Sequence, residues 1–447
     1  MAKLFGTDGV RGLANGDLTP ELAFNLGRAA GTLLKKDGCR SAVVVGRDPR
    51  LSGPMLEGAL TAGLCSAGVD VLLAGVIPTP AVAYLARALN TSAGVVISAS
   101  HNPAPDNGIK FFNDQGFKLD DALEEKIENL IADGLESLPR PTGAGLGRVV
   151  QLADALCRYS SFLKSTVPAL DLTGLRIVLD CANGAASEVA PRLLRELGAQ
   201  VISIHDRPDG LNINSSCGST HPESLQEAVL KYNAHLGLAH DGDADRLVAV
   251  DENGRLVNGD QIMVICGLAM QEKARLGGKV VVTVMSNLGL KQAFARAGIE
   301  VYETKVGDRF VLEKMLATGA VLGGEQSGHL IFLEHSTTGD GLLSALQLLQ
   351  AVKDSGKSLS SLAGQMENLP QVLVNVKVRD KNGWEHNRAV ETAVQDGQKA
   401  LAGKGRLLVR ASGTEPLIRV MAEGPDRMEL KRICERVAGV IGRELGS

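Results

Sequence analysis

Short runs of β-branched and other apolar residues recur along the chain and alternate with longer segments of helical periodicity. Such runs predict buried strands, and the segments between them predict amphipathic helices. The strand patterns lie at residues 43–45, 69–73, 95–98, 176–179, 201–204 and 281–284, and clear helical patterns lie at 54–67 and 188–197. This alternation predicts an α/β protein.

The same helix ending occurs three times. Gly68, Gly198 and Gly298 each follow a helical pattern, and a strand pattern starts directly after each glycine. A glycine at this position supplies a left-handed cap. After each of these strands come another helix, another short strand and a polar loop, so the chain contains three similar α/β units. Their loops converge if the units pack side by side, because ligands of open α/β sheets bind where strands end.

Turn-rich segments and changes of pattern indicate the domain boundaries. A proline- and glycine-rich linker lies at 139–145, a turn lies at 251–254, and the tail changes character at 368–370. The tail pattern predicts a smaller α+β domain. The expected domains are residues 1–150, 151–252, 253–368 and 369–447.

The first polar loop, at residues 98–103, carries the candidate nucleophile Ser100. It reads Ser-Ala-Ser-His-Asn-Pro after a buried strand pattern, so the proline constrains an exposed turn. A serine in a loop is usually a structural hydrogen-bonding group, so its neighbours must support any other role. The Gly-x-Ser-x-Gly pattern of a hydrolase is absent around Ser100. Lys110 lies far enough downstream to return toward the same site.

The second polar loop, at residues 241–246, predicts a cation site. Asp241, Asp243 and Asp245 alternate along it, and such carboxylates can surround one hard cation. The loop is not an EF-hand, because Arg246 occupies the position of the turn glycine and a strand pattern follows. Three carboxylates this close repel one another unless a cation compensates. Mg²⁺ fits better than Ca²⁺, because a site with only a few protein ligands has room for water and a phosphoryl oxygen on the cation.

Two further polar loops carry groups that suit a sugar phosphate. The loop at 324–329 places Glu325 and Ser327 between glycines, where they can hydrogen-bond sugar hydroxyls, although by itself this pattern is more typical of a turn. The loop at 410–416, followed by Arg419, combines arginines, hydroxyls and a glycine, which together suit a phosphate. The glycine-rich segment 143–147 follows a linker rather than a strand, so it is not a dinucleotide motif.

Composition narrows the function further. The 447 residues include 47 Lys and Arg against 51 Asp and Glu, a formal net charge of −4, which argues against nucleic acid or an anionic membrane as the main partner. The 7 cysteines are scattered without metal-site or redox spacing, so we expect reduced thiols. No apolar run is long enough to cross a bilayer, and no signal-peptide pattern opens the chain. A cytoplasmic location is expected.

The four loops, in this order, resemble the α-D-phosphohexomutase superfamily, and so does the opening segment 5–12, Phe-Gly-Thr-Asp-Gly-Val-Arg-Gly. The resemblance covers nearly the whole chain. It implies three similar α/β domains with mixed sheets plus a smaller C-terminal α+β domain around a central cleft. It also implies the following site residues: Ser100 as the phosphoserine and a metal ligand, Asp241, Asp243 and Asp245 as ligands of one Mg²⁺ per chain, Glu325 and Ser327 at the sugar ring, and Arg410, Ser412, Gly413, Thr414 and Arg419 at the substrate's own phosphate.

Within the superfamily, the opening segment and the Gly-Glu-Gln-Ser-Gly-His loop are similar to the bacterial phosphoglucosamine mutases. Phosphomannomutases typically carry Met at the position of Gln326, and His-Ser near Asp308 and Arg309. The similarity implies an isomerase that interconverts glucosamine 6-phosphate and glucosamine 1-phosphate through phospho-Ser100 and a glucosamine 1,6-bisphosphate intermediate. Such a reaction feeds the synthesis of UDP-N-acetylglucosamine, a cell-wall precursor.

Cationic side chains complete the expected catalytic set. Lys110 and Arg246 would stabilise the transferring phosphoryl group, and Arg11 is a further candidate near it. The general base for the sugar hydroxyl is either His101 or Lys110.

Other functions remain alternatives. A phosphomannomutase or phosphoglucomutase would use the same loops. A non-catalytic sugar-phosphate-binding regulator would not need both Ser100 and the three aspartates, and a phosphatase would release phosphate to water. Small sugar phosphates are the expected partners, and an exposed apolar face on the first domain would indicate a homodimer.

Overall fold

The structure is a computed structural model that describes residues 4–6, 8–35, 41–412 and 416–446. The chain divides into two compact units. The first comprises Met1–Met285 and Gly298–Gln365, and the second comprises Ser286–Ala297 and Met366–Ser447.

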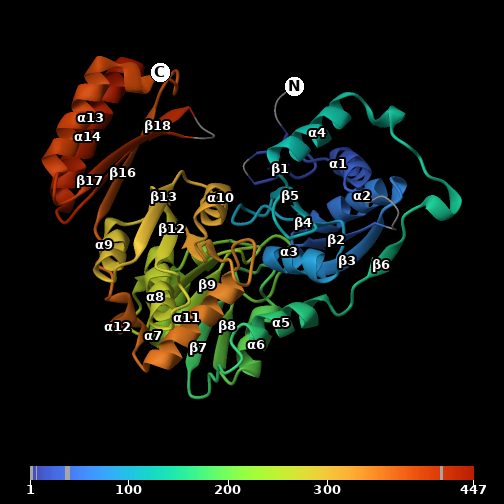
Figure 1. Ribbon diagram of the computed structural model, residues 1–447, viewed down its shortest axis with the longest axis horizontal. Helices are drawn as coiled ribbons and strands as arrows, with labels where there is room; N and C mark the ends of the chain where they lie inside the picture. Colours follow the sequence, from blue (N-terminus) through green and yellow to red (C-terminus); the bar gives the residue numbers. More distant parts are fainter. Residues whose placement is uncertain (1–3, 7, 36–40, 413–415, 447) are drawn as a thin grey trace. The chain divides into compact units, whose positions relative to one another are not determined.

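The first sheet has six strands in the order β1-β5-β4-β2-β3-β6 (Figure 1). Strand β2 is parallel to β3 and β4, and β6 is parallel to β3, whereas β5 is antiparallel to β4 and β1 is antiparallel to β5. The strands are β1 (Val10–Leu13), β2 (Ala42–Arg47), β3 (Asp70–Val76), β4 (Ala93–Ile97), β5 (Asp106–Asn113) and β6 (Val149–Gln151). The sheet is therefore mixed, with its antiparallel strands at one side.

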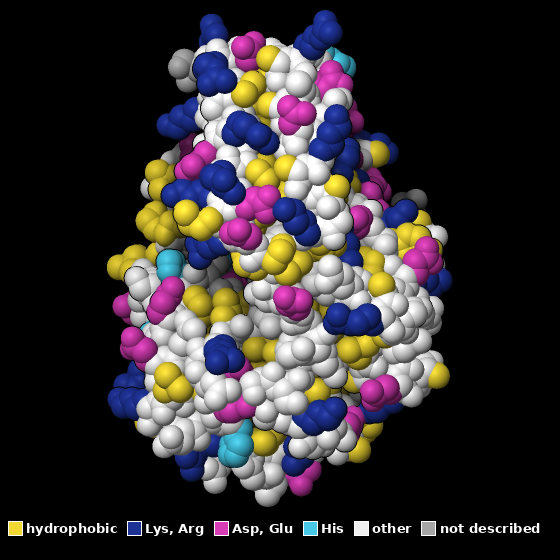
Figure 2. Space-filling model, turned by 90° about the vertical axis from the view of Figure 1, so that its left-hand side faces the viewer, with side chains coloured by type: hydrophobic (Ala, Val, Ile, Leu, Met, Phe, Trp, Pro, Cys, Tyr) yellow, Lys and Arg dark blue, Asp and Glu magenta, His cyan; other side chains and the backbone are white. Residues whose placement is uncertain are grey.

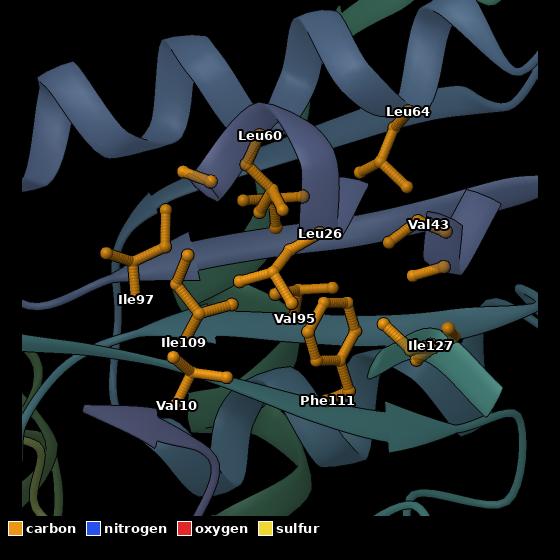
Figure 3. Packing of buried hydrophobic residues seen from close by; sticks show 14 of the residues in the cluster. Val10, Leu26, Val43, Leu60, Leu64, Val95, Ile97, Ile109, Phe111 and Ile127 are labelled. Atoms are coloured by element: carbon orange, nitrogen blue, oxygen red, sulfur yellow. The ribbon is translucent and has the colours of Figure 1, made fainter. Parts of the chain in front are cut away.

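Helices α1 (Pro20–Leu33), α2 (Gly53–Ser66) and α4 (Asp121–Ala132) cover one face of this sheet, and α3 (Thr79–Ala88) packs against β2 and β4 on the other. Figure 3 shows Leu26 of α1 and Leu60 of α2 pointing at Val95 in the sheet. The two helices approach closely because glycines face each other's backbone: a Cβ on Gly27 would lie 2.3 Å from Leu60 O. Burying these aliphatic side chains stabilises the domain by about 1.5–3 kcal/mol each.

The second and third sheets repeat the arrangement. Their orders are β11-β10-β9-β7-β8 and β13-β12-β14-β15, and in each a parallel trio is followed by an antiparallel strand. In the second sheet the short β11 pairs antiparallel with that strand. The strands are β7 (Arg176–Asp180), β8 (Gln200–Ile204), β9 (Leu236–His240), β10 (Leu247–Asp251), β11 (Leu256–Val257), β12 (Lys279–Thr283), β13 (Glu300–Thr304), β14 (Leu322–Gly324) and β15 (Leu330–Phe332). The expectation of three similar α/β units with mixed sheets is confirmed.

Helices lie before, between and after these strands. They are α5 (Ala155–Ser165), α6 (Val189–Glu196), α7 (Glu223–Lys231), α8 (Gly259–Glu272), α9 (Leu288–Arg296), α10 (Asp308–Thr318), α11 (Gly341–Ser355) and α12 (Leu359–Ala363), with short 3₁₀ turns at Leu135–Ser137, Gly143–Gly145 and Gly218–Thr220. The three repeated glycines have φ of +85° (Gly68), +95° (Gly198) and +69° (Gly298), so the predicted left-handed caps are confirmed.

The second unit contains a three-stranded antiparallel sheet in the order β16-β18-β17. Its elements are β16 (Gln371–Lys377), a 3₁₀ turn (Trp384–His386), α13 (Arg388–Leu401), β17 (Arg406–Ala411), β18 (Leu417–Glu423) and α14 (Arg427–Leu445). Val390, Ile418 and Val437 meet in its core. Lys and Arg side chains alternate with Asp and Glu over the outer face of α13 and α14 (Figure 2), as on a solvated helix face. The predicted smaller α+β domain is confirmed.

No helix in the described part of the chain is both long and apolar enough to span a membrane. The four domain boundaries stay predictions, although each predicted domain contains one of the four sheets, apart from the last residue of β6 and the short β11.

Candidate active site

Three polar loops occupy corresponding positions in the first unit. Each joins the third parallel strand of its sheet to the antiparallel strand that follows: the loop after β4 carries Ser100, the loop after β9 carries the three aspartates, and the loop after β14 carries Glu325. The first two loops meet, because the Ser100 hydroxyl donates to Asp241 Oδ2 at 2.6 Å. The third loop joins the second through backbone pairing of Arg246 with His329.

Ser100 is held in an unusual backbone conformation. Its φ is +52°, in the left-handed region that side chains other than glycine, Asn and Asp rarely adopt. The residue is buried, and its Oγ also lies 3.3 Å from His101 Nδ1. Such strain persists only where surrounding contacts fix the backbone, so neighbouring groups must hold Ser100 in this conformation.

Two buried side chains hold the backbone of this loop. Arg50 Nη2 and Asn214 Nδ2 each donate to Ser100 O at 2.9 Å, and both also donate to Asn102 O. Arg50 is fully buried and paired with Asp48 at 2.8 Å. Asp48 in turn accepts from Ser98 Oγ, which accepts from the Ser100 N–H. Sequence reasoning missed Arg50 and Asn214, because both are ordinary polar residues in the sequence and their burial is known only from the structure.

The three aspartates form a compact buried group, with one carboxylate oxygen from each lying within 4.8 Å of the others. Burial, together with the charges of Asp245 and Asp243, raises the pKa of Asp241 well above its ordinary value. Burial and Asp243 raise the pKa of Asp245. Burial also opposes the charge of Asp243, but Lys110 and the Thr79 hydroxyl outweigh it and lower its pKa. The carboxylates therefore destabilise one another.

A cation fits this group. Asp243 Oδ1 and Asp245 Oδ1 are buried and have no hydrogen-bond partner among the described residues. Arg246 Nε lies 3.8 Å from Asp245 Oδ1, which is too far for a hydrogen bond. Buried carboxylate oxygens without a hydrogen bond are costly, and a bound cation would remove both this cost and the mutual repulsion. The triad can hold a metal ion through oxygen ligands only, which suits a hard divalent cation.

Cationic side chains surround the triad. Lys110 Nζ lies 3.1 Å from Asp243 Oδ2 and 3.0 Å from Asp8 Oδ2, and Arg11 donates to Asp8. Burial opposes the charge of Lys110, but Asp243 and Asp8 outweigh it and raise its pKa. Lys110 is therefore protonated at neutral pH. The structure brings Lys110 into direct contact with the acidic loop, while Arg11 reaches this network through Asp8.

The pKa of His101 is lowered, in contrast to that of Lys110. Burial, followed by the charges of Arg246 and Arg11, lowers the pKa of its imidazole to about 4. At neutral pH the ring is therefore uncharged, and its low pKa makes it a weak base. Of the two candidate bases, only His101 is in the basic form in this structure.

The third loop lies beside the end of the acidic loop. Glu325 is half-buried, its Oε1 accepts the Gly307 N–H at 3.0 Å, and its charge acts on Arg246. Ser327 is exposed. His329 is buried, with Nε2 4.0 Å from Asp245 Oδ2, and neither ring nitrogen has a hydrogen-bond partner within the described residues. His329 belongs to the loop pattern, but sequence reasoning gave it no role.

The second unit holds the remaining predicted site residues. Arg410 of β17 lies directly opposite Arg419 of β18 in the antiparallel ladder. Burial and the Arg419 charge lower the pKa of Arg410. Like charges opposite each other are destabilising, so an anion bound between them would be favourable. Ser412 is buried and follows β17. Gly413 and Thr414 lie outside the described residues.

Asp180, His205 and Cys217 form a second cluster with metal-ligand atoms close together. Both Asp180 oxygens already accept backbone N–H groups, from Ala182 and Gly218, and His205 Nδ1 lies 3.0 Å from Oδ2. These contacts join the loop after β7 to the loop after β8. The cluster therefore has a structural role and is not part of the candidate site.

Known proteins resemble this chain throughout its length. Family models of phosphoglucomutase/phosphomannomutase match it in four parts: alpha/beta/alpha domain I at residues 2–137, alpha/beta/alpha domain II at 158–254, alpha/beta/alpha domain III at 258–369 and the C-terminal domain at 373–440. The phosphoglucosamine mutase of Desulforamulus reducens is 60% identical over 443 residues, which cover 99% of this chain and 100% of that protein.

Solved structures show the same fold. A phosphoglucomutase/phosphomannomutase family protein from Burkholderia thailandensis superposes with a TM-score of 0.81 at 28% identity, over 99% of this chain and 97% of that one. The N-acetylphosphoglucosamine mutase of Aspergillus fumigatus, solved in complex with GlcNAc-6P and magnesium, gives a TM-score of 0.70 at 19% identity, over 99% of this chain and 96% of that one. At that identity the second likeness concerns the fold alone.

Proposed function

The chain belongs to the phosphoglucomutase/phosphomannomutase family, and from this premise we propose that it is an isomerase that interconverts glucosamine 6-phosphate and glucosamine 1-phosphate. One observation carries the chemistry: the buried Ser100 hydroxyl donates at 2.6 Å to the acidic loop. A serine nucleophile beside a cation site suits reversible phosphoryl transfer. The product is a precursor for UDP-N-acetylglucosamine synthesis.

The reaction has two transfers. In the first, the bond between phosphorus and Ser100 Oγ breaks, a bond forms to the sugar O1, and the O1 proton passes to a base. In the second, the 6-phosphoryl group of the glucosamine 1,6-bisphosphate returns to Ser100 Oγ, and O6 takes up a proton. The enzyme is thus restored with its phosphoserine, so no phosphate is consumed.

Mg²⁺ is the proposed cofactor, one per chain, bound by Asp241, Asp243, Asp245 and an oxygen on Ser100. Bound there, it would neutralise charge on the phosphoryl oxygens. Support comes from the oxygen atoms of Asp243 and Asp245 that lack hydrogen bonds among the described residues. Lys110 adds a positive charge next to the same group.

The other roles follow from charge and position. We assign Arg246 and Arg11 to stabilisation of the transferring group, and Glu325 and Ser327 to the sugar hydroxyls. The Arg410–Arg419 pair, with Ser412, Gly413 and Thr414, binds the phosphate that is not transferred. His101, uncharged and 3.3 Å from Ser100 Oγ, is favoured over Lys110 as the base. Cytoplasmic location and a homodimer remain predictions from the sequence.

Replacing Ser100 tests the proposal. The Ser100→Ala variant should lose mutase turnover while its circular dichroism spectrum stays unchanged, and it should not gain the mass of a phosphoryl group after exposure to glucosamine 1,6-bisphosphate. The unaltered chain should gain that mass. Full turnover by the alanine variant would refute the phosphoserine mechanism.

Substrate choice needs a separate measurement. The value of kcat/KM should be higher for glucosamine phosphates than for glucose or mannose phosphates. A preference for mannose 1-phosphate would identify a phosphomannomutase instead, and binding without turnover would identify a regulator. Release of inorganic phosphate at the rate of substrate loss would identify a phosphatase.

A further inference from the structure

Thr79 contacts the acidic loop at two points although it belongs to the first sheet's helix α3. It is the first residue of that helix and is 1% exposed. Its hydroxyl donates to Asp243 Oδ2 at 2.7 Å, and its backbone N–H donates to Asp243 O at 3.0 Å. Both the side chain and the main chain of one candidate metal ligand are therefore held by the same residue.

These contacts give the two carboxylate oxygens of Asp243 different surroundings. Oδ2 accepts from Thr79 and also from Lys110 Nζ at 3.1 Å, whereas Oδ1 is buried and has no hydrogen bond to any described residue. With Oδ2 occupied, Asp243 can offer a cation one oxygen only. Monodentate carboxylates are what the compact octahedral shell of Mg²⁺ accommodates.

Thr79 is better suited than Lys110 to fix this orientation. Lys110 Nζ is shared between Asp243 and Asp8, and it ends a long flexible side chain. Thr79 is β-branched, so few rotamers are open to it, and Pro78 and Pro80 restrict the backbone on either side. The N-terminus of α3 also carries partial positive charge, which favours a carboxylate there.

We propose that Thr79 is a positioning residue for the metal site, holding Asp243 so that Oδ1 faces Mg²⁺. The proposal rests on the proposed function, because it assumes Mg²⁺ at the acidic loop. The role assigned to Thr79 is exerted through its two hydrogen bonds to Asp243.

The test compares Thr79→Val, which keeps the shape but removes the hydroxyl, with Thr79→Ser, which keeps the hydroxyl. The full chain is titrated with Mn²⁺ followed by electron paramagnetic resonance, and Mg²⁺ affinity is obtained by displacement. Thr79→Val should bind both metals about 10–100-fold more weakly, the range typical of lost outer contacts to a ligand, and Thr79→Ser should stay within about threefold of the unaltered chain. At saturating Mg²⁺ the KM for the sugar phosphate should be unchanged.

Each other outcome has a definite meaning. Unchanged metal affinity in Thr79→Val, or an equal loss in Thr79→Ser, would overturn the proposal. Thr79→Ala is a second hydroxyl-free variant in case the valine variant does not fold. Failure of both to fold would also overturn it, since the role assigned is local to one carboxylate. If the unaltered chain binds neither metal, the metal site itself is wrong, which separates failure of the proposed function from failure of this inference.

Discussion

At the scale of single residues, the candidate site depends on side chains that hold other residues in place. Ser100 keeps a left-handed backbone because Arg50 and Asn214 both donate to its carbonyl oxygen. This conformation aims its hydroxyl at Asp241. A strained residue that is fixed from two sides is ready for reaction without further rearrangement.

Removing one donor should therefore slow the reaction. Asn214 itself has φ of +57°, which Asp tolerates, so Asn214→Asp keeps the backbone and loses the donor to Ser100 O and Asn102 O. We expect kcat to fall by about tenfold or more, because among the described residues only Arg50 would still donate to these two carbonyls and each lost hydrogen bond is worth roughly 0.5–1.5 kcal/mol. Steady-state kinetics of the mutase reaction measures it. Asn233→Asp is the matched control, because Asn233 has φ of +48° on the exposed surface. Equal kcat in both variants would show that the hydrogen bonds from Asn214 do not position Ser100.

At the scale of elements, glycine serves two different purposes in the repeated units. Gly298 stands after α9 with φ of +69°, where the helix must end and the next strand begin. Gly58 lies within α2, on its exposed side. A Cβ at either position would meet no atom within 4 Å, so neither glycine is required by packing. Their contributions to stability differ through backbone conformation alone.

Alanine at these two positions should act in opposite directions. Gly298→Ala forces a Cβ into the left-handed region and should lower the free energy of unfolding by about 1–2 kcal/mol. Gly58→Ala should raise it by about 0.5–1 kcal/mol, because alanine is the better helix former. Urea unfolding at constant pH measures both. Stabilisation by Gly298→Ala would show that the cap is not held in the left-handed form.

At the scale of the whole molecule, the chain consists of two compact units with separate cores. The acidic loop with Ser100 belongs to the first unit, and the Arg410–Arg419 pair belongs to the second. A ligand that binds a native unit stabilises that unit against unfolding. The two proposed ligand sites therefore have distinguishable effects on stability.

Calorimetric scans should show this separation. Mg²⁺ should raise the midpoint of the transition that unfolds the first unit, and inorganic phosphate should raise the other. At a hundredfold excess over Kd the gain is about 2.7 kcal/mol in each case. Sodium chloride at the same ionic strength is the control, since it screens charge without filling either site. A Mg²⁺ effect that persists in Asp243→Asn with equal size would place the metal elsewhere.

The sequence by itself determined the three similar α/β units, the left-handed glycine caps and the polar loops. These features depend on local patterns, because alternation of apolar residues, cap glycines and loop composition act over a few neighbouring positions. The expected roles of Ser100 and the three aspartates could also be stated from their motifs. The structure places Ser100 in a hydrogen bond with Asp241 and brings one oxygen of each aspartate within 4.8 Å of the others.

Only the tertiary structure decided how those loops are held. Thr79 and Asp243 are 164 positions apart, and Asn214 is 114 positions from Ser100. Nothing in the neighbourhood of Thr79, Arg50 or Asn214 distinguishes it from an ordinary polar residue. The role of each arises when folding buries it against a distant segment, where a hydrogen bond left unmade is costly and therefore fixes one orientation. The helix α9 likewise belongs with the second unit by packing, although it lies in the sequence between strands of the third sheet.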